Sequence, residues 1–332
     1  MDGTKLRRAL WDILYQGRSI TAAIAPFCEK IEYSDELHGK SDELTLTVND
    51  ADGLWRGPWY PGKGDRIALT FGLEDGPQQP AGSFEIEEIE QSFGRDGGAV
   101  MQIKALSAGI TGPMRTERTE GHEQITLAQL ATLYADKHRL TVAGDIPNIA
   151  FNRITQTRES DLGFLKRLAD EHGLCLAVKD DKLLFTSRAA LKESGAVLGI
   201  GRKDIIDGRL RDKTLQTYSA AEVAYSDPAT GKTINVTVKA PGVTSGDTHK
   251  ITERVENELQ ARQRADAALN RLNAGERGGS LKLPGDPRIA AGVKLALNGD
   301  FGRMAGVYLI EKARHSFSKS DGYTTEVEIK TP

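Results

Sequence analysis

The chain carries the same β-strand pattern twice, and this repeat limits its possible folds more than any other feature. Gly64–Thr70 (GDRIALT) matches Gly292–Asn298 (GVKLALN), 228 positions further along. Gly82–Glu88 (GSFEIEE) matches Gly306–Lys312 (GVYLIEK), 224 positions further along. Apolar and polar residues alternate within both pairs, which is typical of β-strands that bury one face.

Two shorter matches follow in the same order. Ser92–Phe93 corresponds to Ser316–Phe317 at 224 positions, and Gln102–Lys104 corresponds to Glu328–Lys330 at 226 positions. Matches that keep one order over such a distance predict a duplicated β domain with a different segment between the copies. Two copies per chain allow three chains to supply six similar units, so a threefold object could mate with a sixfold one.

Length and composition indicate a multidomain globular protein. With 332 residues the chain exceeds the size at which one core keeps growing, so we expect two or three domains. Hydrophobic residues make up 39% and charged residues 27%, and the mean hydropathy is −0.41, which is ordinary for a soluble fold. No apolar run approaches the roughly 20 residues that span a bilayer, and Met1–Arg8 lacks a signal-peptide pattern. We therefore expect folding in the cytoplasm.

Net charge and cysteine content give two further expectations, one on nucleic-acid binding and one on the state of the thiols. A net charge of −3 and a pI near 6.1 provide no basic surface for wrapping nucleic acid, so we expect no specific nucleic-acid binding. The lack of a long apolar run predicts no membrane insertion. The two cysteines, Cys28 and Cys175, lie far apart among apolar residues, and we expect buried free thiols.

We predict three regions along the chain. Residues 1–115 form a first antiparallel β domain, and residues 191–332 form a second one that contains a long helix at 251–272. Residues 116–190 show helical periodicity and predict a small α+β insertion, in which Thr126 and Ser160 each cap a helix. The fold class is mainly β, with two antiparallel barrels or sandwiches that flank the insertion.

Each β domain is expected to begin with a strand pair, at 20–33 and 41–48 in the first and at 214–226 and 232–239 in the second. In the second, the long helix follows, and the Gly-rich segment Asn273–Ser280 ends it as a loop.

Motifs for catalysis or metal binding are weak. Gly231-Lys232-Thr233 could cradle a phosphate, but it joins two alternating strands, and we interpret Ser226–Thr233 as a hairpin turn. The histidines and cysteines show no metal-ligand spacing, and no GxSxG motif occurs. We expect no enzyme, no cofactor and no metal, although a catalytic site that leaves no motif stays open.

An aromatic loop is a candidate contact surface. Trp55, Arg56, Trp59 and Tyr60 lie close together in a stretch with two prolines and two glycines. Such side chains could stack on a sugar, but they also dominate packing cores and subunit interfaces. We favour packing or an interface.

A row of acidic residues follows one predicted strand. Glu85 lies on the face opposite Phe84 and Ile86, and the Glu87-Glu88 pair breaks the alternation, which predicts a β-bulge. The acidic face could simply be solvated. Alternatively, Glu85 and Glu87 could line a lumen, where carboxylates would repel a passing nucleic acid.

One segment resembles a known family. Residues 154–173 (ITQTRESDLGFLKRLADEHG) are similar to the signature of the phage late control gene D proteins, which are tail or baseplate hub proteins, and of their type VI secretion spike relatives. Ala313–Ser318 and Gly322–Thr325 also resemble that family. The residues that carry the motif are Arg158, Glu159, Ser160, Asp161, Phe164, Leu165, Arg167, Leu168 and Gly173. We interpret the motif as helix-start and core chemistry, although its charged members could contact a neighbouring protein.

The resemblance implies a virion structural protein, a homotrimeric hub at the tip of a contractile injection system. Two tail-tube-like β domains per chain would form a pseudo-sixfold ring that adapts the tail tube to the threefold spike and encloses part of the channel. The implied partners are the chain itself, the tail tube protein, the central spike protein and the baseplate wedge proteins, with the tape measure protein as a further candidate. The implied location is the virion tail or baseplate, assembled in the cytoplasm of the bacterial host.

Two alternative functions and the role of residues 1–18 stay open at this point. The aromatic loop also fits a peptidoglycan- or carbohydrate-binding tail module, and the many carboxylates fit, less well, a cell-wall hydrolase. Residues 1–18 form either a docking arm or the first strand. Because the chain ends at Pro332, directly after the last predicted strand, the spike is expected to be a separate protein.

Overall fold

The structure is a computed structural model that describes residues 8–94, 98–107, 109, 112–212, 218–226, 232–240, 246–252, 255–273 and 277–332. It is mainly antiparallel β, with several sheets and a helical insertion, which confirms the predicted fold class. Among these residues, no helix combines the length and the apolar character that crossing a bilayer requires.

The first β-unit is built on one twisted sheet. Its strands lie in the order β3-β4-β7-β6-β5-β1-β2, and α1 (Thr21–Ile24) covers part of one face. The strands are β1 (Ala9–Tyr15), β2 (Arg18–Ser19), β3 (Cys28–Glu36), β4 (Glu43–Asn49), β5 (Arg66–Leu73), β6 (Gln78–Gly94) and β7 (Gly98–Ser107). Residues 9–15 therefore form the first strand, which was one of the two alternatives for residues 1–18. Residues 1–7 lie outside the described residues.

The second β-unit repeats this arrangement and confirms the duplication. Its strands lie in the order β14-β18-β21-β20-β19-β13, which matches β3-β4-β7-β6-β5-β1 position by position. One difference is that β13 runs parallel to β19, whereas β1 runs antiparallel to β5. The elements are β13 (Ala196–Ile200), η1 (Arg202–Asp204), β14 (Asp207–Asp212), β18 (Arg277–Pro284), β19 (Lys294–Leu297), η2 (Gly299–Met304), β20 (Gly306–Ser318) and β21 (Gly322–Lys330).

The strand registers of the two units agree. Leu69 pairs with Gly82, and Leu297 pairs with Gly306, so the offsets of 228 and 224 seen in the sequence are also the structural ones. Both glycines have a positive φ, +104° and +151°, a backbone conformation that glycine adopts without steric cost.

The predicted β-bulge is also confirmed, and it occurs twice. The ladder between β6 and β7 shifts between Ile86 and Glu88, and the ladder between β20 and β21 shifts at the equivalent place, between Ile310 and Lys312. Beyond the bulge, Glu88 faces Lys104 and Lys312 faces Glu328. Lys104 and Glu328 are 224 positions apart, so the offset of 226 for the third block was wrong by two residues.

The strand pair expected at 214–226 and 232–239 is not the counterpart of 20–33 and 41–48. β15 (Tyr218–Ser226) and β16 (Thr233–Lys239) form a separate sheet with β17 (Asp247–Ile251), inserted between β14 and β18. Ser226 pairs with Thr233, so the two strands are antiparallel neighbours; residues 227–231 of the expected turn lie outside the described residues.

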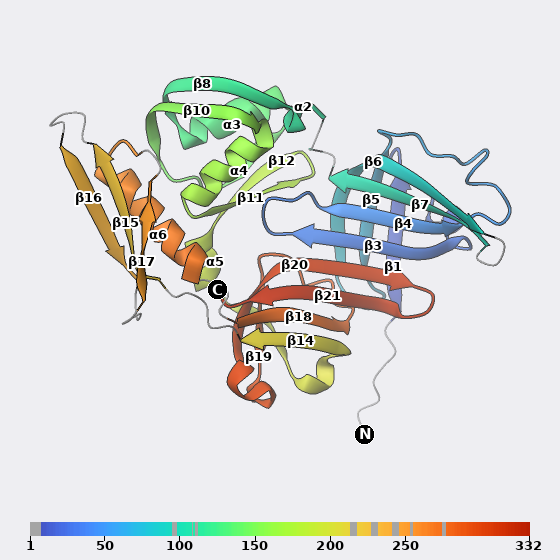
Figure 1. The fold of residues 1–332 in the computed structure, drawn as a ribbon. Helices are drawn as coiled ribbons and strands as arrows, with labels where there is room; N and C mark the ends of the chain where they lie inside the picture. The colour runs from blue at the N-terminus through green and yellow to red at the C-terminus, as the bar shows by residue number, and fades with distance from the viewer. Residues whose placement is uncertain are drawn as a thin grey trace.

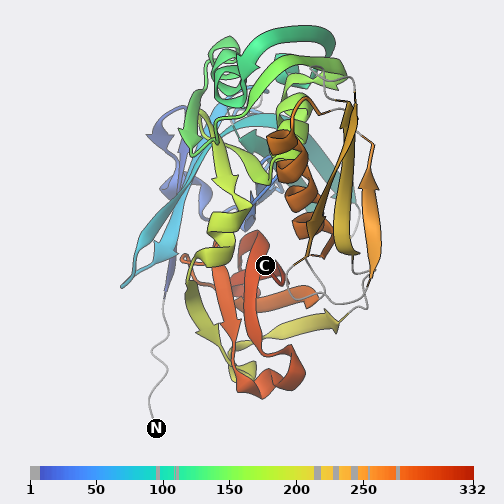
Figure 2. The same ribbon diagram turned by 90° about the vertical axis from the view of Figure 1, so that its left-hand side faces the viewer.

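The long helix starts later than expected. α6 (Glu258–Asn273) replaces the helix expected at 251–272, because residues 247–251 pair with β15 and the Asn257 side chain caps the helix by accepting from the Gln260 amide at 2.9 Å. Leu259, in the first turn of α6, is 62% exposed. In Figure 2, α6 lies between its own sheet and the insertion.

The segment Asn273–Ser280 is only partly a loop, because β18 already begins at Arg277. Gly278 and Gly279 lie in this strand, where added Cβ atoms would collide with the backbone of β21 and β14 respectively. Glycine is needed at these two positions because the neighbouring strands approach so closely. Residues 274–276 lie outside the described residues.

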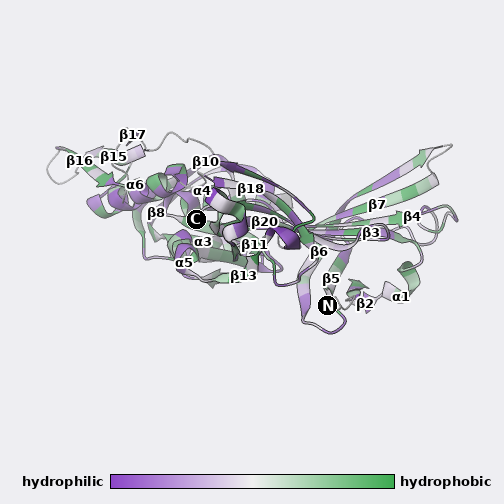
Figure 3. Ribbon diagram, turned by 90° about the horizontal axis from the view of Figure 1, so that it is seen from below, coloured by the Kyte–Doolittle hydropathy of each residue, from purple (hydrophilic) through white to green (hydrophobic). Residues whose placement is uncertain are grey.

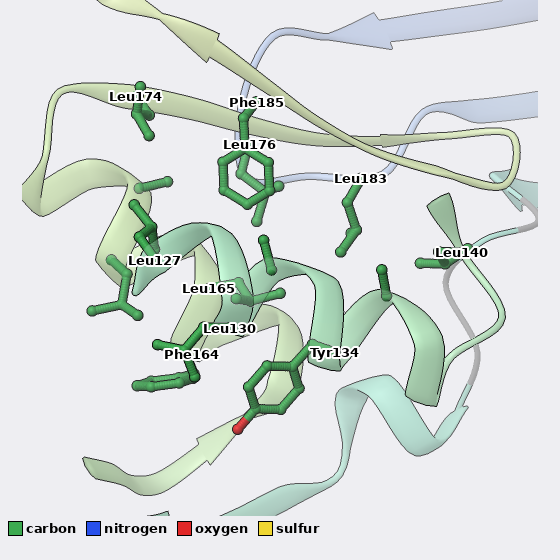
Figure 4. Close-up of a cluster of buried hydrophobic side chains, with 14 of the residues drawn as sticks. Leu127, Leu130, Tyr134, Leu140, Phe164, Leu165, Leu174, Leu176, Leu183 and Phe185 are labelled. Atoms are coloured by element: carbon green, nitrogen blue, oxygen red, sulfur yellow. The ribbon is translucent and has the colours of Figure 1, made fainter. Parts of the chain in front are cut away.

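The insertion has its own apolar core (Figure 4). Thr126 and Ser160 cap α3 and α4, as predicted, and Gly173 follows the end of α4 with φ of +70°. The elements are α2 (Gly112–Arg115), β8 (Glu117–Thr126), α3 (Leu127–Lys137), β9 (Thr141–Gly144), β10 (Ala150–Ser160), α4 (Asp161–Glu171), β11 (Leu174–Lys179), β12 (Lys182–Ser187) and α5 (Arg188–Glu193).

The two β-units share one sheet. β20 pairs with β3 from Lys312 opposite Glu36 to Ser318 opposite Lys30, and Figure 1 shows β20, β21, β18 and β14 continuing the sheet beyond β3. Phe317 of the second unit is only 5% exposed and belongs to the apolar core of the first unit. Strand pairing and an inserted aromatic side chain therefore join the units.

Replacing Phe317 with alanine should destabilise the first unit, although Phe317 belongs to the second. The cavity left in a packed core costs about 3–5 kcal/mol. All three tryptophans lie in the first unit, so urea unfolding followed by tryptophan fluorescence reports on it directly. Leu259→Ala is the control, because its exposed side chain should change the unfolding free energy by less than about 0.5 kcal/mol. Equal midpoints for both variants would contradict this role of Phe317.

Candidate subunit interface

The outer half of β6 has one edge without a strand partner. β7 pairs with Phe84–Gly94 along one side of β6, and β5 pairs with Gln78–Glu85 along the other. Within the described ranges, no strand continues beside Glu88–Gly94 on the β5 side. We call Glu88–Gly94 the open edge of β6. It lies towards the outer end of the β6–β7 hairpin, at the periphery of the protein (Figures 1 and 3).

The equivalent edge of β20 is occupied. β21 pairs along one side of β20, β19 pairs with Gly306–Leu309 on the other side, and β3 pairs with Lys312–Ser318 beyond it. The position that is open in β6 therefore holds β3 in the second unit, and this contact is the joint between the units.

A second free edge belongs to β14. β14 is the counterpart of β3 but, among the strands that the structure describes, pairs with β18 alone, and every residue in it except Leu210 is exposed. Unpaired N–H and C=O groups on such an edge are a template for adding another strand. β14 and β6 stand on opposite sides of the β20–β3 joint, so the chain holds one complete joint and the two separate halves of another.

Phe93 on the open edge and its counterpart Phe317 in the β20–β3 joint have different surroundings. Phe317 stacks on Tyr323 with ring centres 4.3 Å apart and meets Phe71 edge-on at 5.8 Å. Phe93 is 83% exposed. The matching Ser-Phe pairs in the sequence were the signal that could have identified this surface, but the pairing partners of the two strands were needed to interpret it.

The candidate lumen residues lie on or beside a polar sheet face. The Glu85 carboxylate is 3.8 Å from the Arg66 guanidinium, and the Glu88 carboxylate is 3.0 Å from the Lys104 ammonium. Glu87 occupies the bulge, and Arg115 of α2 contacts its carboxylate at 2.6 Å. The acidic row is therefore partly neutralised, and Glu88 follows Glu85 along the same face.

The aromatic loop divides into a buried and an exposed part. Trp55 is 4% exposed and belongs to the core of the first unit, so its ring offers no free face for a sugar. Arg56 pairs with Asp50 at 3.1 Å. Trp59 packs edge-on against Trp55 with ring centres 5.7 Å apart, while Tyr60 is 53% exposed. These last two side chains line an apolar cavity of about 290 Å³.

The motif residues of the insertion hold α4 in place. Phe164, Leu165 and Leu168 are buried in the insertion core. Arg167 donates to both carboxylate oxygens of Glu159, at 2.7 and 2.9 Å, and to Glu171 at 2.9 Å. Arg158 has a positive φ of +50° at a second bulge, in β10, and its amide donates to Thr119.

Asp161 is a fully buried carboxylate at the start of α4. It accepts from Gln156 at 3.0 Å, contacts His138 at 2.8 Å and pairs with Lys137 at 3.0 Å. Burial alone would raise the pKa of Asp161, but the hydrogen bonds from these three residues outweigh it and hold the pKa below its ordinary value. The motif aspartate therefore ties the end of α3 to the start of α4.

No family model matches the chain. It is 29% identical over 202 residues to a probable baseplate hub protein of Escherichia phage 186, which covers 60% of this chain and 49% of the relative. It is 30% identical over 193 residues to a probable baseplate hub protein of Escherichia phage P2, which covers 58% and 47%. The chain thus matches about half the length of these curated relatives.

Solved structures share the fold along nearly the whole chain. A tail protein from Neisseria meningitidis superposes with a TM-score of 0.73 at 14% identity, over 97% of this chain and 96% of that one. A component of the Escherichia coli type VI secretion system, described as similar to bacteriophage T4 tail proteins, gives a TM-score of 0.53 at 14% identity, over 92% and 73%. The expected resemblance to phage hub proteins and their secretion relatives is confirmed.

Asp161→Asn should destabilise the insertion at neutral pH by about 3 kcal/mol, because it leaves buried polar partners without their charge. The folded-state pKa is lower than the unfolded one, so this stabilisation is complete above the ordinary value of 3.8 and is lost as the pH falls below it. The difference between wild type and variant in urea unfolding, followed by circular dichroism, should narrow on acidification. Exposed Asp136→Asn is the control, and a difference independent of pH would contradict this assignment.

Proposed function

We propose that this chain is a structural hub protein of a contractile tail, in a phage or a phage-like particle. Three copies form a ring of six β-units that adapts the sixfold tail tube to the threefold central spike. Support comes from two relatives named as probable baseplate hub proteins and from a fold shared with tail proteins. The proposal gives the chain no enzymatic activity, in keeping with relatives named for a structural role.

One observation carries the proposal: the duplicated β-unit has a complete joint inside the chain and two unmatched edges outside it. The edges differ, so copies associate head to tail. Such heterologous contacts generate either an open filament or a closed ring. A ring of three chains places six similar units around one axis, which suits a sixfold partner on one side.

The polar sheet face is our candidate for the channel lining. It carries Glu85 and Glu88, with Glu87 at its rim, and these carboxylates lie near Arg66, Lys104 and Arg115. A polar lining with paired charges would let nucleic acid pass without holding it. The opposite face of each unit is apolar and fills the cores.

The remaining assignments follow from the same role. The proposed partners are the tail tube, the central spike and the baseplate wedge proteins, with the tape measure protein as a further candidate. Trp59 and Tyr60, at the rim of the apolar cavity, are candidate contacts for one of them. The proposed location is the baseplate of a virion assembled in the host cytoplasm.

Light scattering after gel filtration tests the proposal. At micromolar concentration we expect a mass three times the chain mass of 36.1 kDa, because obligate interfaces bury more than roughly 2,000 Å². A monomer over the whole range from 1 to about 100 μM would contradict the autonomous ring that we propose.

A further inference from the structure

We infer that copies of this chain join by adding β14 of one copy to the open edge of β6 in the next, in one defined register. In that register, the exposed Phe93 inserts beside Gly208 of the neighbouring copy. The inference rests on the proposed trimer, and it deepens that proposal by specifying which residues meet.

The register follows from the joint already present inside the chain. The open edge of β6 and the paired half of β20 are equivalent at an offset of 224, so Phe93 corresponds to Phe317 and Gly94 to Ser318. In the internal joint, Phe317 lies opposite Ile31. If β14 of a neighbouring copy pairs with β6 as β3 pairs with β20, Phe93 lies opposite the β14 residue that corresponds to Ile31.

The ladders identify that residue as Gly208. On β3, Ile31 pairs with Leu46 of β4, and on β14, Gly208 pairs with Leu281 of β18. Leu46 and Leu281 are themselves equivalent, because their partners on the next strands are Ile103 and Val327, 224 positions apart. Phe93 of one copy is thus placed opposite Gly208 of the next.

A pocket lies where the Phe93 ring would enter. It has a volume of about 400 Å³. Gly208, Leu210, Leu281, Phe301 and Met304 line it together with the charged residues Arg202, Asp207 and Asp300. An apolar cavity of roughly 150 Å³ already holds a benzene ring, so there is room for a phenyl group.

Glycine keeps this pocket open. A Cβ atom on Gly208 would lie 2.7 Å from the Leu281 side chain, on the face that leads into the core of the second unit. An aromatic ring packed across a strand glycine is a recognised way to stabilise an edge. Ile206, at the same pocket, is also exposed and would be covered by the added strand.

Charges on the other face favour the same register. Arg211 corresponds to Ser34, which lies opposite Arg314 in the internal joint, so Arg211 would lie opposite Glu90 of the neighbouring copy. Both side chains are exposed in the single chain. Opposite charges on directly facing residues stabilise a strand pair, whereas pairing β14 with another β14 would bring arginines together.

Engineered disulfides test the register. Ser92 would lie opposite Arg209, with Cα atoms about 4.5–5.5 Å apart, which suits a disulfide. The chain carrying Ser92→Cys and Arg209→Cys should form covalent dimers and trimers under mild oxidation. The two native cysteines are buried and should not interfere.

Two matched variants control the chemistry. Ser316→Cys with Glu32→Cys places the same pair in the internal joint and should give a disulfide within one chain, without covalent oligomers. Ser92→Cys with Asp212→Cys is out of register by three residues, roughly 10 Å, and should form no link. Covalent oligomers only from the first pair support the inference. A trimeric mass with no linking, or with linking through the out-of-register pair, overturns the register but not the trimer, and a monomer overturns both.

Phe93→Ala tests the inserted side chain independently. Because Phe93 is exposed in the single chain, the variant should keep the unfolding midpoint of the dissociated protein. It should weaken association at least tenfold, as measured by sedimentation over a dilution series. Unchanged association would remove Phe93 from the interface.

Discussion

The pairing of β20 with β3 joins the two halves of the chain. It merges two sheets into one, places Phe317 in a core that belongs to the other half of the chain and adds a Lys312–Glu36 ion pair at 2.6 Å. Without it, the two β-units would be separate domains on a linker. With it, the two units form one continuous sheet with two unlike free edges, as head-to-tail contacts between copies require.

The insertion braces this joint. Asp35 of β3 pairs with Lys179 of the insertion and accepts from the Ala291 amide of the second unit at 2.8 Å, so three parts of the chain meet at one carboxylate. Nearby, burial raises the pKa of Asp42 to about 6, with Lys179 opposing and Asp35 adding to the shift. His38 accepts from the Leu176 amide and contacts Asp170 on α4. These contacts attach the insertion to both β-units beside the joint.

What could be predicted from the sequence follows from how each element buries its side chains. Strands with one wet face alternate clearly, so β5, β6, β19 and β20 and their repeat were identifiable. β8 and β10 were missed because their few apolar residues, Ile125, Phe151 and Ile154, are too widely spaced to give the alternation of a one-sided strand, although they pack on the insertion core. β14 was missed because it is short, charged and exposed. Free edges depend on which strand lies beside which, and residue periodicity contains no information about that neighbour.

Electron cryomicroscopy of the purified assembly would show directly which strands join neighbouring copies. We expect six similar β-units around one axis, with the three joints within chains superposing on the three between chains and β6 lying beside β14 of the next copy. A trimer held by other surfaces, with Glu88–Gly94 facing solvent, would contradict this arrangement.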